Sequence, residues 1–168
     1  RVRNMEPGQT ISSMLDSGEV DGALIHQVPE CFRAGSPRVK RIFPDYGAAE
    51  IEYYRRTGIH PIMHCVVLRK DVYERDPWAL RSVYDAMCEA KDRTLERISD
   101  VGALSAMVPP LPAVLDQTCE VFGQDFWPYG IEANRKTLEK LVLYAYQQGL
   151  TPRLFEVEEL FGESVRDV

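Results

Sequence analysis

Hydrophobic residues recur at helical spacing through much of the second half of the chain. From Asp76 to about Arg97 the apolar positions repeat every three or four residues, which predicts a helix with Asp76 as its N-cap and Pro77 in its first turn. Shorter stripes of the same kind, most of them closed by a glycine, predict further helices. These are expected at residues 10–18, 48–57, 111–122 and 134–149.

Two other stretches have the character of β-strands. Between Pro61 and Arg69 the chain has its longest apolar run, which is interrupted only by His64 and is β-branched toward its end. Residues 20–26 form a second candidate strand. Apolar strands of this kind are usually buried on both faces of a parallel or mixed sheet. In combination with the helices, they predict an α/β fold.

Composition and charge exclude several classes of protein. The 168 residues carry a net charge of -6 and no Lys/Arg block longer than two, which argues against a nucleic-acid-binding surface. No apolar stretch approaches the roughly 20 residues that a membrane-spanning helix needs. The four cysteines are widely spaced without a C-x-x-C motif, so we expect reduced thiols and no zinc site.

Several unusual phrases resemble a known family. They are Tyr53–His64 ("YYRRTGIHPIMH"), Val67–Tyr73 ("VLRKDVY"), Pro77-Trp78, Asp125–Arg135 ("DFWPYGIEANR") and Glu158–Phe161 ("EELF"). They are similar to the second half of 4,5-dihydroxyphthalate decarboxylases, which resemble type II periplasmic substrate-binding proteins. The resemblance extends over essentially all 168 residues.

The resemblance implies two α/β lobes joined by crossing strands, with a ligand in the cleft between them. Such proteins are about twice this length, so we expect this chain to be the C-terminal half of a longer protein. The start of the chain, which has neither an initial methionine nor a signal peptide, agrees with that expectation. On this interpretation residues 1–60 end the second α/β lobe. Residues 61–168 supply the crossover strand and the helical part of the first lobe.

The implied reaction is decarboxylation of 4,5-dihydroxyphthalate or a related aromatic acid, with no cofactor expected. The alternative is a solute-binding component of an ABC transporter for a small anionic or aromatic ligand. The enzyme would be cytoplasmic, whereas the transport component would be periplasmic. Beyond the ligand, the expected partner is the missing N-terminal half of the same protein. Neither nucleic acid nor a membrane span is expected.

The chemistry of the implied reaction selects the candidate site residues. Loss of a ring carboxylate requires a proton donor, for which His64 is the first candidate and His60 the second, although either could be structural. Arg55 and Arg56 could bind a carboxylate, or could simply favour a helix C-terminus.

Two further residues are candidates for ligand contact. His26 ends the second predicted strand, and the C-terminal ends of strands face ligands in open α/β sheets. Trp127 could stack on an aromatic ring, or could pack its loop onto the domain. His60 and His64 would share one side of a strand, which leaves a bridging metal open as an alternative, but no metal site is predicted.

Overall fold

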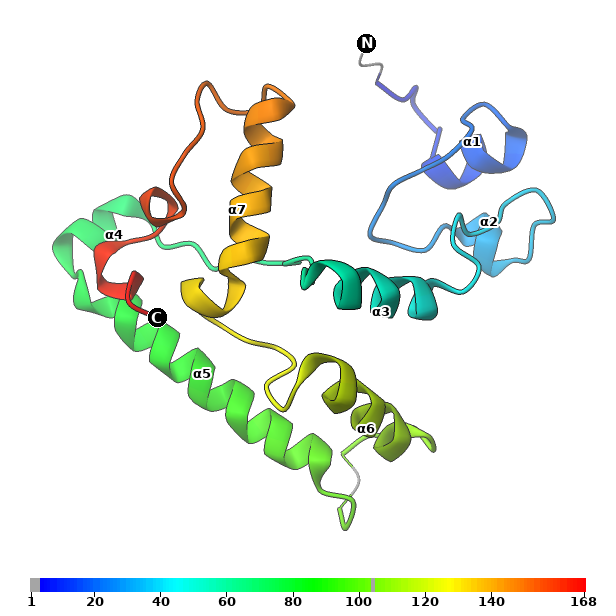
Figure 1. Ribbon diagram of the computed structural model, residues 1–168. Helices are drawn as coiled ribbons and strands as arrows, with labels where there is room; N and C mark the ends of the chain where they lie inside the picture. The colour runs from blue at the N-terminus through cyan, green and yellow to red at the C-terminus, as the bar shows by residue number, and fades with distance from the viewer. Residues whose placement is uncertain (1–3, 104) are drawn as a thin grey trace. The chain divides into compact units, whose positions relative to one another are not determined.

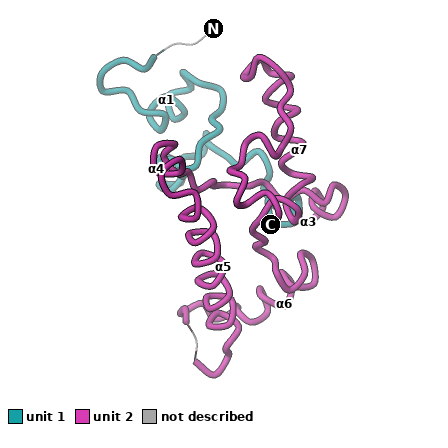
Figure 2. Tube along the Cα trace, turned by 90° about the vertical axis from the view of Figure 1, so that its left-hand side faces the viewer, with its two compact units in different colours: residues 1–50 teal, residues 51–168 magenta. Residues whose placement is uncertain are grey.

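The computed structural model describes residues 4–103 and 105–168 and divides the chain into two compact units. The first unit ends at Glu50 and the second comprises Ile51–Val168, as the two colours of Figure 2 show. Figure 1 traces the helices in chain order. They are α1 (Ile11–Ser17), α2 (Glu30–Arg33), α3 (Tyr46–Thr57), α4 (Lys70–Arg75), α5 (Trp78–Ser99), α6 (Leu111–Phe122), α7 (Ile131–Gln147) and the 3-10 helices η1 (Val157–Leu160) and η2 (Glu163–Val165).

The predicted α/β fold is wrong for the described residues, because none of them forms a strand. Residues 62–69, the expected crossover strand, have no regular secondary structure, and nor do residues 20–26. A strand is defined by hydrogen bonds to a neighbouring strand, and no described segment pairs with either stretch. The apolar pattern indicates a tendency to extended structure, but a strand also needs a neighbouring strand, which the pattern cannot provide. The two-lobe architecture of a binding protein therefore has no support here.

The predicted positions of the longer helices agree with the structure, although the N-cap of α5 is Pro77 and not Asp76 as predicted. Helices α3, α5, α6 and α7 lie within a few residues of the stretches whose apolar spacing predicts them. Helix α1 begins as predicted: Thr10 Oγ1 accepts a hydrogen bond from Ser13 N at 3.0 Å, and Ser13 Oγ accepts one from Thr10 N at 3.0 Å. It ends at Gly18, whose φ of 79° is in the left-handed region. The assignment of residues 1–60 and 61–168 to separate lobes stays a prediction.

The first unit is held together by contacts between its two short helices. Ser12 Oγ in α1 accepts a hydrogen bond from Cys31 N in α2 at 2.9 Å. Ser36 Oγ donates to Asp16 Oδ1 at 2.6 Å, which ties the chain after α2 back to α1. Met14 is the buried side chain of α1. Polar contacts therefore hold this unit together, because its hydrophobic core is very small.

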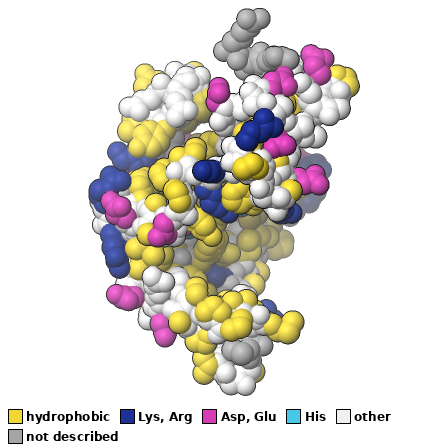
Figure 3. All heavy atoms as spheres, turned by 90° about the vertical axis from the view of Figure 1, so that its right-hand side faces the viewer, with side chains coloured by type: hydrophobic (Ala, Val, Ile, Leu, Met, Phe, Trp, Pro, Cys, Tyr) yellow, Lys and Arg dark blue, Asp and Glu magenta, His cyan; other side chains and the backbone are white. Residues whose placement is uncertain are grey.

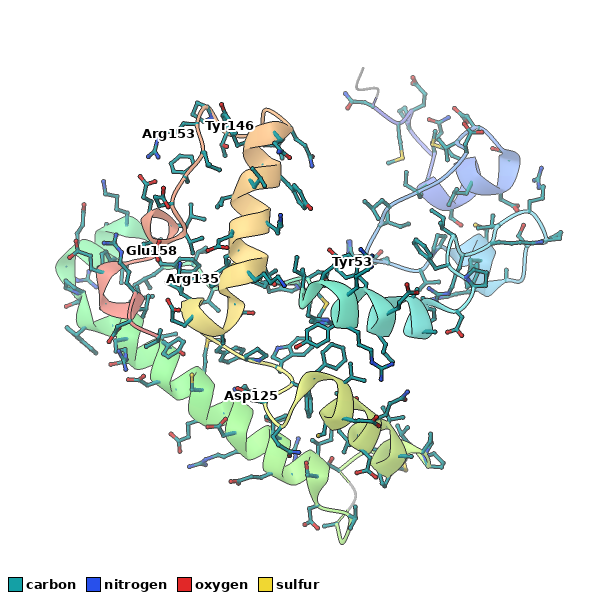
Figure 4. All side chains as sticks on the ribbon, in the orientation of Figure 1. Tyr53, Asp125, Arg135, Tyr146, Arg153 and Glu158 are labelled. Atoms are coloured by element: carbon teal, nitrogen blue, oxygen red, sulfur yellow. The ribbon has the colours of Figure 1, made fainter. Side chains whose placement is uncertain are left out.

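The second unit is organised around α7. Ile131, Leu138 and Val157 form its buried cluster, which brings η1 against α7, and Val142 and Phe161 pack on this cluster. An ion pair reinforces the same contact, since Arg135 of α7 donates to Glu158 of η1 at 2.7 Å and also bonds Glu132. Arg135 and Glu158 point toward one another in Figure 4. The core and the ion pair together fix the orientation of α7.

The last residue of the chain closes the start of α7. The carbonyl of Val168 accepts hydrogen bonds from the backbone N–H of Ile131 at 2.6 Å and of Glu132 at 3.3 Å. These are two of the N–H groups that a helix N-terminus leaves without a partner. Gly130 makes this approach possible, because its φ is 93° and a Cβ there would lie 2.6 Å from the Val168 carbonyl carbon.

A second ion pair predicts how the fold responds to acid. Arg153 donates to both carboxylate oxygens of Glu159, at 2.8 and 2.6 Å, and the backbone N–H of Glu156 donates to the same group at 2.8 Å. The bonds from Arg153 and then from that N–H lower the pKa of Glu159 from its usual 4.5 to about 2. The native state therefore favours the ionised carboxylate.

We expect the stability contributed by Glu159 to be complete above pH 4.5 and to be lost as the pH falls toward 2. In Glu159→Gln, the urea midpoint should fall less between pH 5 and pH 3 than in the wild type. Glu139→Gln is the control, since Glu139 makes no ion pair among the described residues. Equal falls in Glu159→Gln and the wild type would show that this bond does not contribute.

The described residues contain neither a membrane-spanning helix nor a cluster of metal ligands. Within residues 4–103 and 105–168, no helix is both long enough and apolar enough to cross a membrane. No group of three or more His, Cys, Asp or Glu side chains with the geometry to hold a metal ion occurs in that part of the chain. The four cysteines are free thiols.

Candidate functional site

A cleft with a volume of about 620 Å³ lies within the second unit. The end of α3, the extended segment after it, α5, the end of α6, the aromatic loop at residues 125–130 and α7 all contribute to its walls. His60, His64 and Trp127, which the sequence singled out, all line it. The folding of one unit thus brings together residues that are widely separated in the sequence.

One side of the cleft is an aromatic wall formed by Tyr54, His60, Phe122 and Trp127. The ring centroids of Tyr54 and Phe122 are 4.4 Å apart. The His60 ring meets Phe122 nearly edge-on, at 5.4 Å and 74°, and meets Trp127 at 6.0 Å and 63°. These distances and tilts are typical of favourable aromatic pairs. The wall therefore presents ring faces and edges that suit a planar aromatic ligand.

The loop that carries Trp127 is anchored at both ends. At one end, Lys91 Nζ of α5 lies 2.7 Å from Asp125 Oδ2 and 5.3 Å from the centroid of the Tyr129 ring. At the other end, Asn134 Nδ2 donates to the carbonyls of Pro128 and Gly130, each at 2.9 Å. Asp125 is labelled in Figure 4. These bonds hold the loop in a defined position, although Trp127 itself keeps 43% of its surface exposed.

The two histidines of the cleft are both exposed, but their contacts differ. The His60 ring is packed in the aromatic wall, and its backbone carbonyl accepts a hydrogen bond from Thr137 Oγ1 at 3.4 Å. His64 is exposed, and its side chain makes no hydrogen bond or ring contact with the described residues. Ring contacts therefore hold the His60 side chain, whereas the His64 imidazole keeps its hydrogen-bonding capacity for a ligand.

Tyr84 of α5 adds a protonated phenol to the lining of the cleft. Burial, followed by a hydrogen bond with Cys88, raises the pKa of Tyr84 to about 12. This hydroxyl is therefore neutral across the physiological pH range and can donate a hydrogen bond. No sequence pattern identified Tyr84, because its spacing in α5 marks it as one more residue of an apolar helix face.

Positive charge is scarce in this cleft. None of the described residues that line it is Lys or Arg, and Asp125 is already paired with Lys91. Lys136 lies at the margin, with its Nζ 3.2 Å from the position that a Cβ on Gly58 would take. The cleft itself is thus mostly apolar and aromatic, with two imidazole groups in its lining and the ammonium groups of Lys91 and Lys136 next to lining residues.

The other predicted contacts lie outside the lining. Arg55 and Arg56 occupy the last turn of α3, where a positive charge suits the helix dipole, and Arg56 lies over the Tyr53 ring at 5.6 Å. His26 belongs to the first unit and is exposed. The second aromatic residue that packs on His60, Phe122, was not predicted, because its helical spacing alone marks it as a core position.

Comparison with known proteins gives the family. No protein-family model matches the chain. A Comamonas testosteroni protein named 4,5-dihydroxyphthalate decarboxylase is 35% identical over 158 residues, which are 94% of this chain and 48% of that protein. A Pseudomonas putida protein of the same name is 37% identical over 54 residues, which are 32% of this chain and 21% of that protein.

The chain therefore spans about half the length of the first of these relatives. Neither relative is named as a transport protein, so the expectation of a solute-binding component has no support from them.

Proposed function

The chain belongs to the family of the 4,5-dihydroxyphthalate decarboxylases, and from this premise we propose that it forms part of an enzyme that decarboxylates a dihydroxylated aromatic acid. The observation that carries the proposal is the 35% identity over 94% of the chain. The cleft of the second unit is the candidate active site, because it combines an aromatic wall with two imidazole groups. The names of the two relatives give the substrate class. The chemistry of the residues that line the cleft gives the proposed role of each residue.

The ring of the substrate would lie against the aromatic wall. Trp127 and Phe122 offer ring contacts of the kind that orient planar ligands, and the His60 ring packs against both. Lys136 at the margin supplies an ammonium group for the carboxylate that stays on the ring. Tyr84 can donate a hydrogen bond to an oxygen of the ligand.

The reaction breaks one bond and forms one bond. The bond between a ring carbon and its carboxylate carbon breaks, and carbon dioxide leaves without the electron pair of that bond. The electron pair stays on the ring carbon, which takes up a proton, and from 4,5-dihydroxyphthalate the product is 3,4-dihydroxybenzoate. The hydroxyl para to that carbon, once deprotonated, makes the carbon basic. His64, exposed in the cleft, is the proposed proton donor.

The two tryptophans of the chain provide a test of ring binding. Trp127 lines the cleft, whereas Trp78, which is 67% exposed at the start of α5, does not. Addition of 3,4-dihydroxybenzoate should quench the indole fluorescence of Trp78→Phe, which keeps Trp127. The same ligand should leave the fluorescence of Trp127→Phe nearly unchanged.

The affinity for 3,4-dihydroxybenzoate should also depend on Trp127 and not on Trp78. Replacement of Trp127 by leucine removes an aromatic contact worth about 0.5–1.5 kcal/mol, so the Kd for 3,4-dihydroxybenzoate should rise by roughly 2- to 12-fold. Trp78→Leu is the matched control and should keep the wild-type Kd. Equal affinities for the two leucine variants, measured by calorimetry, would place the ring outside this cleft.

A further inference from the structure

The segment at residues 62–68 has an unusual backbone. It runs extended between α3 and α4, and its N–H and C=O groups make no hydrogen bond with the described residues. A run of this length with unpaired backbone N–H and C=O groups resembles an edge strand that has no neighbouring strand. Such an edge is a template for pairing with another extended chain.

The side chains of this segment are also exposed. Met63 and Val66 are each 61% exposed and Val67 is 86% exposed. The segment contains no proline, glycine, lysine or acidic residue, which are the residues that natural edges use to prevent pairing. Hydrophobic side chains cover much of the molecular face in Figure 3. An unprotected apolar edge of this kind marks either an interaction site or a site of aggregation.

The length of the relatives indicates what covers it. The matched region is 48% of the Comamonas testosteroni protein, so that relative carries a comparable length of polypeptide outside the match. We propose that residues 62–68 dock against an extended, apolar strand of such a polypeptide through backbone hydrogen bonds. This occupant fits better than a small ligand, because a peptide backbone can satisfy the alternating N–H and C=O groups of the whole segment.

Docking would also complete the cleft. Residues 62–66 line the cleft as well as belonging to the exposed segment, so a strand placed beside them forms an additional wall. That wall is the place from which a further cation could reach the carboxylates of a substrate. This consequence rests on the proposed function, whereas the docking itself does not.

Hydrogen exchange and thiol alkylation test the docking directly. The probe is the unmatched part of the Comamonas testosteroni protein, supplied either fused to this chain or as a separate polypeptide. In the chain alone, the amides of residues 62–68 should exchange at nearly unprotected rates and the exposed Cys65 should react rapidly with iodoacetamide. With the probe, both rates should fall by about tenfold or more. Protection of the α7 amides confirms in each sample that the second unit is folded.

Two variants test whether the protection depends on residues 62–68. Val67→Lys places a charge on the segment and should restore fast exchange in the presence of the probe. Val101→Lys is the matched control, because Val101 is 69% exposed outside the segment, and it should keep the protection. Fast exchange at 62–68 with the probe in both arrangements would overturn the proposal. Slow exchange in the chain alone would also overturn it, because the segment would then be covered by its own chain or by a second copy.

Discussion

Replacing His64 with alanine is expected to lower kcat for decarboxylation by about 10²- to 10⁴-fold, the usual contribution of a positioned general acid. His64 is exposed in the cleft, and its imidazole makes no hydrogen bond with the described residues, so its loss should leave the fold intact. KM should change by only a few-fold, because the aromatic wall that holds the ring is kept. The measurement is steady-state turnover of 4,5-dihydroxyphthalate by this chain combined with the unmatched part of the Comamonas testosteroni protein.

Two comparisons separate a chemical role of His64 from a structural one. Imidazole added to the His64→Ala protein should restore part of the lost rate, since it can supply the missing proton donor. His60→Gln should instead raise KM more than it lowers kcat, because His60 packs in the aromatic wall beside Trp127. Near-normal turnover in His64→Ala would remove His64 from the mechanism.

The largest expected effect on stability is that of Leu138→Ala. Leu138 is 3% exposed and packs with Ile131 and Val157 in the buried cluster that fixes α7. Truncation of a buried leucine costs about 2–5 kcal/mol in the free energy of unfolding. Few side chains of this unit are fully buried, so we expect this loss to remove a large part of its stability.

The control for this variant lies one turn away on the same helix. Leu141 is 53% exposed, so Leu141→Ala should change the free energy of unfolding by no more than about 0.5 kcal/mol. Urea unfolding followed by the helical circular dichroism signal compares the two variants. If both variants unfold at the same urea concentration, the cluster at Leu138 is not the core of the second unit.

The helices were predictable because their information is local. The three- and four-residue spacing of apolar side chains in α5 and α7, and the Thr10 cap and Gly18 terminus of α1, can be read without knowledge of the rest of the fold. The end of α7 that Val168 caps could not be read in this way, because the hydrogen bond joins distant parts of the chain.

The strand prediction failed because its pattern reports burial and not pairing. Residues 62–68 are apolar at every position except His64, which is typical of a strand buried on both faces of a sheet, but the pattern cannot show that a strand is present to pair with it. The described residues supply no neighbour, so the segment stays extended and exposed.

The candidate site was predictable only in part. The rarity of histidine and the aromatic loop pointed to His60, His64 and Trp127, all of which line one cleft. Phe122 and Tyr84 were missed because each sits in a regular helical stripe, where an aromatic residue is usually part of the core. Arg55 and Arg56 illustrate the opposite case, since charges at a helix end are explained without a ligand.

Release of carbon dioxide from 4,5-dihydroxyphthalate is the most direct test of the proposed function. The measurement uses this chain together with the unmatched part of the Comamonas testosteroni protein, with 3,4-dihydroxybenzoate quantified in the same samples. We predict release in a one-to-one ratio with that product, and its loss in His64→Ala. Binding of the aromatic acid with no release above the uncatalysed background would contradict the assignment as a decarboxylase.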